Sequence, residues 1–201
     1  MNITIDRKTG VLLAIIVLLG AAVISMAISR DHNGMKSGHM GGHSSSQANG
    51  NLTGADVMFL QMMIPHHQQA VDISELALSK SKDRELTELA KAIANGQRAE
   101  IVKMKAWLKD AGASEDMGHS MHDMGGMLSD EELTALTSAT GTKFDLLWLQ
   151  GMTAHHDGAL HMTQMIEDAQ NPEIKAFGEA IVIEQSAQIE QMKAMLNRLG
   201  G

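Results

Sequence analysis

Three observations predict an all-α fold for this sequence. The expected fold is a four-helix bundle built from two similar helix hairpins. Proline occurs only twice in 201 residues, so the chain can form long uninterrupted helices. Apolar residues recur at alternating spacings of three and four, which is typical of a helix with one buried face. The pattern of residues 54–110 returns in residues 143–199. Because a single hairpin can bury only one face, we expect the two hairpins to pack together within residues 53–201.

Local signals mark the ends of the expected helices. Thr53 and Asp56 form a capping-box pattern before the first apolar run, and Asn171-Pro172 combines a good N-cap with proline at the first helical position. Gly112 is suited to end the second helix. The expected helices span about residues 54–80, 83–110, 129–139, 142–169 and 172–201.

The N-terminus carries an apolar segment that is expected to meet a membrane. Residues 11–28 form an uncharged run of 18 residues that follows two basic residues. Because about 20 apolar residues span a bilayer, this run fits an uncleaved transmembrane anchor within residues 1–30, and a cleaved secretory signal is the alternative. Since the positive flank stays inside, residues 31–201 are expected outside the cytoplasm in either case, in the periplasm or at the cell surface. Residues 31–52, rich in Gly, Ser and His, read as a flexible linker.

The composition excludes several classes of protein. A formal net charge of −8 argues against a nucleic-acid binder, which needs basic patches to neutralise phosphate. The absence of cysteine excludes disulfides, zinc–thiolate sites and thiol catalysis. The 17 methionines and 10 histidines stand beside only five aromatic residues, three Phe and two Trp. Methionine fills core space readily, but that does not explain methionine in polar loops.

Two histidine pairs stand at matching places in the two halves, His66-His67 and His155-His156. Adjacent helical residues point about 100° apart, so one pair cannot hold a single ion side by side. The apolar stripes place His67 and His156 toward the core, and we expect His66 and His155 at its flank.

Methionine precedes the inner histidine of each pair by one helical turn. Met63 lies four residues before His67, and Met152 lies four before His156, so thioether and imidazole share one helix face. Soft thioether sulfur selects Cu(I), and imidazole binds copper of either oxidation state. The repeated spacing favours a copper site over histidines that merely pack beside core methionines. The same spacing recurs in His161 and Met165.

Two loops share the methionine and histidine composition. Six Met or His residues occur within the Gly-rich residues 111–128, where exposed methionine has no packing role. Short tracts of this kind are typical of metal capture. The candidate ligands in this loop are Met117, His119, Met121, His122 and Met124, with Met127 beside them. Residues 32–43 of the linker have a similar composition.

Polar residues within the apolar stripes are candidates for holding the imidazoles in place. Gln97 and Gln185 occupy matching positions, and a buried amide needs a partner. Each is expected either to orient a facing imidazole or to hydrogen-bond between helices and fix their register. Glu100 and Glu184 are further candidates for the same role.

The run Met-Ile-Pro-His-His at residues 63–67 is followed, on the next helix, by Gln97, Glu100, Ile101 and Met104. By these motifs the chain resembles the family labelled domain of unknown function 305, over about residues 54–110 and 143–199. The resemblance implies a ferritin-like four-helix bundle, and some members are periplasmic proteins that bind copper and serve in copper tolerance. The ligands that it implies by position are Met63, His66, His67, Met104, Met152, His155, His156 and Met192.

We therefore expect an extracytoplasmic copper-binding protein, not an enzyme, that sequesters or hands on copper ions, with Cu(I) favoured. The membrane is the second expected partner, nucleic acid is not a partner, and a copper-delivery protein and the oligomeric state are left open. A ferritin-like di-metal oxidase needs Glu-x-x-His on two helices, and no Glu stands three residues before any paired histidine. A cuprous oxidase with the same Met and His ligands remains an alternative, as does a membrane-anchored interaction domain without metal.

Overall fold

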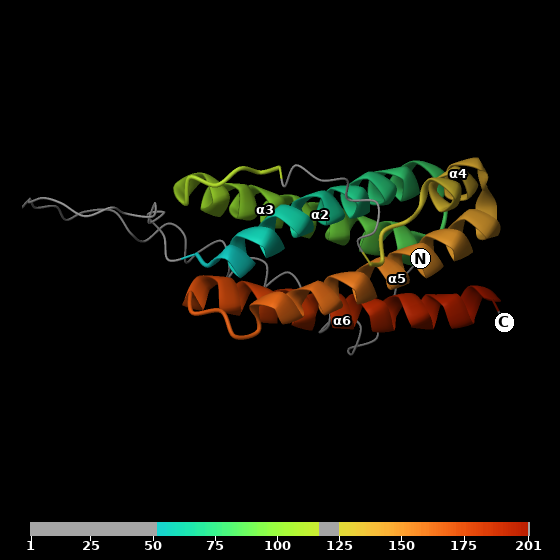
Figure 1. Ribbon diagram of the computed structural model, residues 1–201. Helices are drawn as coiled ribbons and strands as arrows, with labels where there is room; N and C mark the ends of the chain where they lie inside the picture. Colours follow the sequence, from blue (N-terminus) through green and yellow to red (C-terminus); the bar gives the residue numbers. More distant parts are fainter. Residues whose placement is uncertain (1–51, 117–124, 201) are drawn as a thin grey trace, which may run out of the picture. The chain divides into compact units, whose positions relative to one another are not determined.

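Helices make up all the regular secondary structure in the computed structural model, which describes residues 52–116 and 125–200. In chain order they are α2 (Gly54–Lys80), α3 (Arg84–Asp110), α4 (Asp130–Ser138), α5 (Gly141–Thr163), the 3₁₀ turn η1 (Gln164–Ile166) and α6 (Pro172–Gly200) (Figure 1). No strand occurs in these two ranges. The all-α prediction is therefore confirmed.

The predicted capping signals act as expected. Thr53 caps α2 and accepts a hydrogen bond from the Asp56 backbone N–H, while the Asp56 side chain accepts from the Thr53 backbone. The Asn171 side chain accepts from the N–H of Glu173 at 2.9 Å and so caps α6. Gly112, just beyond α3, has a φ of 67°, which glycine adopts at no steric cost. These ends fix the lengths of the helices that carry the site.

The fourth expected helix ends earlier than the sequence suggests. We expected it to run to about residue 169, but α5 stops at Thr163 and tightens into η1. The Gln164 backbone N–H donates to the His161 carbonyl, and the Glu167 backbone N–H donates to the Gln164 carbonyl at 3.4 Å. Such bonds to carbonyls three residues back replace the α-helical pattern at a helix end, and apolar spacing does not reveal them.

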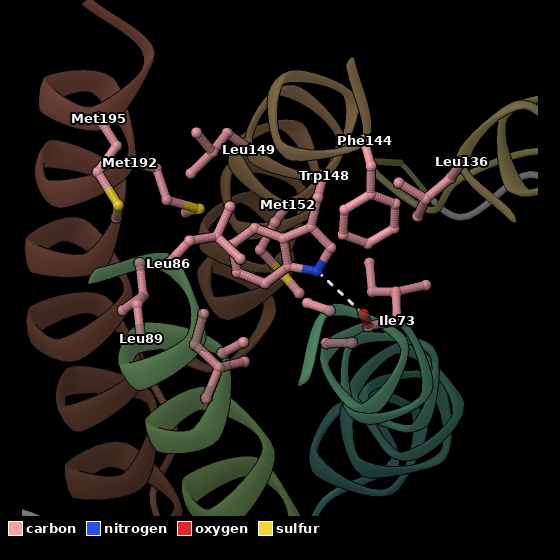
Figure 2. Packing of buried hydrophobic residues seen from close by; sticks show 14 of the residues in the cluster. Ile73, Leu86, Leu89, Leu136, Phe144, Trp148, Leu149, Met152, Met192 and Met195 are labelled. Carbon is pink, nitrogen blue, oxygen red and sulfur yellow. Dashed lines mark hydrogen bonds between the residues drawn. The ribbon is translucent and has the colours of Figure 1, made fainter. Parts of the chain in front are cut away.

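The long helices pack as two hairpins joined face to face. α2 packs against α3, α5 packs against α6, and α2 lies against α5 (Figure 1). Trp148 on α5 is fully buried, and its indole N–H donates to the Ile73 carbonyl of α2 at 3.0 Å (Figure 2). This bond ties the two hairpins together.

The core falls into two apolar clusters. The first cluster includes Ile73, Leu86, Trp148, Met152 and Met192, and Figure 2 shows these side chains gathered around the indole ring. The second includes Phe59, Met63, Met104, Ile174 and Phe177. Neither cluster contains a histidine, although the histidine pairs lie between cluster members along both α2 and α5. A polar layer therefore divides the apolar core.

The predicted membrane segment, residues 11–28, lies outside the described residues. Within the described ranges no helix is long and apolar enough to cross a bilayer.

Candidate metal site

The polar layer consists of His66, His67, His155 and His156, and we call these four residues the histidine layer. All four side chains are fully buried. The His66 and His155 rings lie 3.8 Å apart between centroids, whereas the two rings within each pair lie 6.4 and 6.3 Å apart. The expectation that His66 and His155 lie at the flank of the core is therefore wrong. They face each other because α2 packs directly on α5.

Each of the other two imidazoles is held by a residue on the neighbouring helix of its own hairpin. The Nε2 atom of His67 lies 2.7 Å from Oε2 of Glu100 on α3. The Nε2 atom of His156 lies 2.6 Å from Oε1 of Gln188 on α6. Both partner oxygens accept hydrogen bonds, so each imidazole donates from Nε2, and Nδ1 is the ring nitrogen that holds the lone pair in the neutral form.

The glutamines predicted to orient these imidazoles do not do so. Neither amide atom of Gln97 has a hydrogen-bond partner, and Oε1 of Gln185 has none. Both side chains are nevertheless buried. The prediction of Glu100 as an orienting residue is confirmed. Glu184 acts through Gln188, because its side chain accepts a hydrogen bond from the Gln188 amide at 3.0 Å.

Six nitrogens of the histidine layer lack a well-formed hydrogen bond within the protein, although the backbone of Gly125 approaches the His66 ring and the backbone of His66 approaches the His155 ring. They are both ring nitrogens of His66 and of His155, and Nδ1 of His67 and of His156. A buried polar group without a partner costs about 1–3 kcal/mol, so such groups are rare in folded proteins and need an explanation. Lone pairs of buried imidazoles, gathered in one layer, are what a soft or borderline metal ion binds.

Burial keeps three of these imidazoles neutral. Burial, as the largest cause, and the neighbouring His67 and His156 together lower the pKa of His66 to about 3. Burial also lowers the pKa of His156 to about 4. The pKa of His155 lies well below its ordinary value for the same reason, with His66 as the next cause. Since only a neutral imidazole has a free lone pair, the layer is ready to bind a metal ion at neutral pH.

Buried methionines flank the histidine layer on both sides. Met63 and Met104 belong to one apolar cluster, Met152 and Met192 belong to the other, and all four are fully buried. The sequence predicted these four residues as ligands, and the fold brings each methionine pair onto one hairpin. We call Met63, Met104 and His67 the first half-site, and we call Met152, Met192 and His156 the second half-site.

A short segment, residues 125–128, crosses α2 and α5 beside the histidine layer. The Gln69 amide donates to the Leu128 carbonyl at 3.0 Å, and its oxygen accepts from the Leu128 N–H at 2.8 Å. Gly126 has a φ of 89°, and a Cβ there would lie 2.7 Å from the Ala154 carbonyl oxygen. A Cβ at Gly158 would collide with the Gly125 carbonyl. Glycines therefore let this crossing segment lie directly on α5.

Other predicted ligands lie apart from the histidine layer or outside the described residues. His161 is exposed, and its Nδ1 donates to the Asp157 carbonyl at 2.8 Å. Met165 is partly buried against the second cluster. The structure does not describe the loop ligands Met117, His119, Met121, His122 and Met124.

Histidine and carboxylate side chains alone do not form a metal centre in this fold. In residues 52–116 and 125–200, no group of three or more His, Asp or Glu side chains is arranged to hold one ion. Surface hollows lined by Lys105, Lys109 and Glu115, or by residues of α4, lie away from the histidine layer. The candidate site is thus enclosed, and it depends on methionine sulfur beside imidazole.

Sequence reasoning missed two residues that shape the site. Gln188 was detectable, because it occupies in the second half the position of Glu100 in the first. The contact of Gly158 with the crossing segment left no signal in the sequence, since it depends on a loop from elsewhere in the chain.

Several solved structures are similar to this chain. A DUF305 protein from Streptomyces coelicolor is 29% identical with a TM-score of 0.69, and the match covers 73% of this chain and 94% of that one. A DUF305 fragment from Deinococcus radiodurans is 32% identical with a TM-score of 0.68, covering 73% and 97%. CopM in the Cu(I)-bound form is 33% identical with a TM-score of 0.63, covering 73% and 98%.

CopM has also been solved in Cu(II)-bound and silver-bound forms. No curated protein sequence matches the chain. The model of the family described as "Domain of unknown function (DUF305)" matches residues 56–196, which include both histidine pairs and all four buried methionines of the half-sites. The chain therefore belongs to the DUF305 family.

Proposed function

We propose that this protein binds copper ions as cargo, with Cu(I) favoured, and sequesters them or hands them on outside the cytoplasm. One observation carries the proposal: four fully buried imidazoles form a layer with six unpartnered nitrogens, and buried methionines flank it on both sides. Thioether sulfur selects Cu(I), and neutral imidazole accepts either oxidation state. The similarity to CopM, which is 33% identical and was solved with copper bound, supports the same ligand class.

The expected place of action follows from the N-terminal sequence. Residues 11–28 are apolar and uncharged, and two basic residues precede them. We propose that this segment anchors the protein in the membrane or directs its export, so that the ferritin-like bundle of two hairpins lies outside the cytoplasm. Thioethers suit that compartment, because thiols there tend to oxidise to disulfides.

A metal-dependent oxidase of the ferritin-like type is the second candidate. The observation that favours it is the approach of carboxylates to the histidine layer, since Glu100 contacts His67 and Glu184 contacts Gln188. Di-metal oxidases need carboxylates that bind the ions directly. Here Glu100 is engaged with an imidazole N–H, which supports a binding role over an oxidase.

The test is an anaerobic titration of the full-length protein with Cu(I) against a chromophoric competitor. The variant replaces Met63 and Met152 by Leu and His67 and His156 by Gln. It should lose tight sites relative to the wild type. Met195→Leu is a matched control, because Met195 is buried on α6 but belongs to no half-site. If the variant and the wild type titrate alike, the half-sites are architecture and the proposal is wrong for the bundle.

A further inference from the structure

The residue that contacts the histidine of each half-site differs between the two halves. The sequence match that relates His67 to His156 also relates Glu100 to Gln188. Each residue contacts Nε2 of its histidine at nearly the same distance, 2.7 Å for Glu100 and 2.6 Å for Gln188. The hydrogen-bond geometry is therefore conserved between the halves, while the charge behind the imidazole is not.

The orientation of the Gln188 amide is fixed by its other neighbour. The Gln188 NH₂ group donates to Oε1 of Glu184 at 3.0 Å. The amide oxygen then faces His156. The same Glu184 oxygen would lie 3.3 Å from a Cβ at Gly96, which is the residue of the first half that matches Glu184. Glu100 therefore hydrogen-bonds directly with His67, whereas Glu184 is connected to His156 only through Gln188.

Building on the proposed copper binding, we infer that Glu100 and Gln188 are specificity-determining residues that make the two half-sites unequal. The first half-site accepts Cu(II) as well as Cu(I), whereas the second half-site is selective for Cu(I). One bundle can then hold copper of either oxidation state. The methionine and histidine ligands of the two half-sites occupy matching positions in the internal repeat.

Coulomb's law gives the physical reason. A carboxylate that accepts a hydrogen bond from the Nε2–H group increases the electron density of the imidazole and places a negative charge near the ion. An amide in the same position carries no charge. The attraction scales with the charge of the ion, so its logarithmic effect on affinity is about twice as large for Cu(II) as for Cu(I). Partners of this kind typically change metal affinity by about 10- to 100-fold. The methionine sulfurs, which favour Cu(I), are the same in both halves.

The experiment compares Cu(I) and Cu(II) binding to the full-length protein. Cu(I) is titrated anaerobically and Cu(II) aerobically without reductant, each against a chelator of known affinity. Glu100→Gln should weaken one Cu(II) site by about 10- to 100-fold and the corresponding Cu(I) site by about 3- to 10-fold. The double variant Glu184→Gln with Gln188→Glu exchanges carboxylate and amide without changing the net charge. It should strengthen Cu(II) binding at the second half-site in the same proportion.

Glu190→Gln is the matched control, because it removes one exposed carboxylate from α6, and it should change neither affinity. A purely structural role for Glu100 would weaken Cu(I) and Cu(II) binding equally, and that result would overturn the inference. Unchanged affinities in both variants would overturn it as well, while the proposed function would stand. A wild-type protein that binds neither ion would overturn both. If Glu100→Gln does not fold, the double variant Glu184→Gln with Gln188→Glu tests the inference by itself, because its expected result is a gain of Cu(II) affinity.

Discussion

The apolar clusters and the histidine layer use the same four helices for opposite purposes. In the clusters, large side chains such as Trp148 and Phe59 are fully buried, and each such burial contributes about 1.5–3 kcal/mol to stability. In the layer, six imidazole nitrogens are buried without partners, at a cost of about 1–3 kcal/mol each. The clusters therefore stabilise the fold and the layer supplies the unpartnered nitrogens, while the four half-site methionines belong to the clusters as well. Mutations of cluster residues outside the half-sites should change stability without removing a proposed ligand.

The largest expected effect on stability comes from the first apolar cluster. Trp148→Ala removes the largest fully buried side chain and its hydrogen bond to the Ile73 carbonyl. We expect a loss of about 3–5 kcal/mol in the free energy of unfolding, measured by urea denaturation of the metal-free protein. Val102→Ala is the control, because Val102 is 69% exposed and its truncation should cost less than about 0.5 kcal/mol. An equal loss in both variants would mean that the cluster does not carry the stability of the bundle.

The helices and two of the four imidazoles were predictable from sequence, for a local reason. Capping residues such as Thr53 and Asn171 act within one turn, and the spacing of Met63 and His67 defines one helix face. The stacking of His66 on His155 was not predictable, because it depends on which hairpin face meets the other. Periodicity likewise could not choose between Gln97 and Glu100, which lie one turn apart on α3, whereas the packed helices bring only Glu100 to His67.

Lowering the pH should reduce the free energy of unfolding through the histidine layer, because the apolar clusters contain no titratable group. Below pH 6.5 the unfolded chain binds protons that the folded chain excludes, because burial lowers the pKa of His66 to about 3 and that of His156 to about 4. Stability is therefore full above pH 6.5 and falls as the pH drops toward those values, by about 2 kcal/mol for each of these two imidazoles down to about pH 5. Urea titrations of the metal-free protein at several pH values measure this slope. Replacing His66 and His155 together by Leu should flatten it, and an unchanged slope would locate the protonation elsewhere.

The crossing segment offers a comparison between two glycines of α5. Gly158→Ala places a methyl group against the Gly125 backbone, which cannot move without displacing the segment. We expect a loss of about 1–3 kcal/mol, measured by thermal unfolding. Gly151→Ala meets only the Leu128 side chain, at 3.0 Å, and that flexible chain can shift at little cost. If the two variants lose equal stability, close backbone approach at Gly158 is not what holds residues 125–128 in place.

The last expected effect has the opposite pH dependence and lowers the stability of the fold on the alkaline side. Burial, as the largest cause, and the nearby Glu100 together raise the pKa of Glu184 to about 7. Such a group stabilises the fold fully below its unfolded value of 4.5, and that stability is lost as the pH rises through about 7. Glu184→Gln should thus leave stability unchanged at about pH 4.5 and raise it by up to about 3 kcal/mol at about pH 8, since the new amide oxygen still accepts from Gln188. Glu190→Gln is the control, because Glu190 is exposed, and this variant should show no gain in stability. A gain of equal size would mean that the net charge of the protein, rather than the burial of Glu184, lowers stability at alkaline pH. The metal-free protein is then most stable near about pH 6.5, where the imidazoles of His66 and His156 are neutral and most of Glu184 is still protonated. Copper binding at the imidazoles should extend that range toward acid.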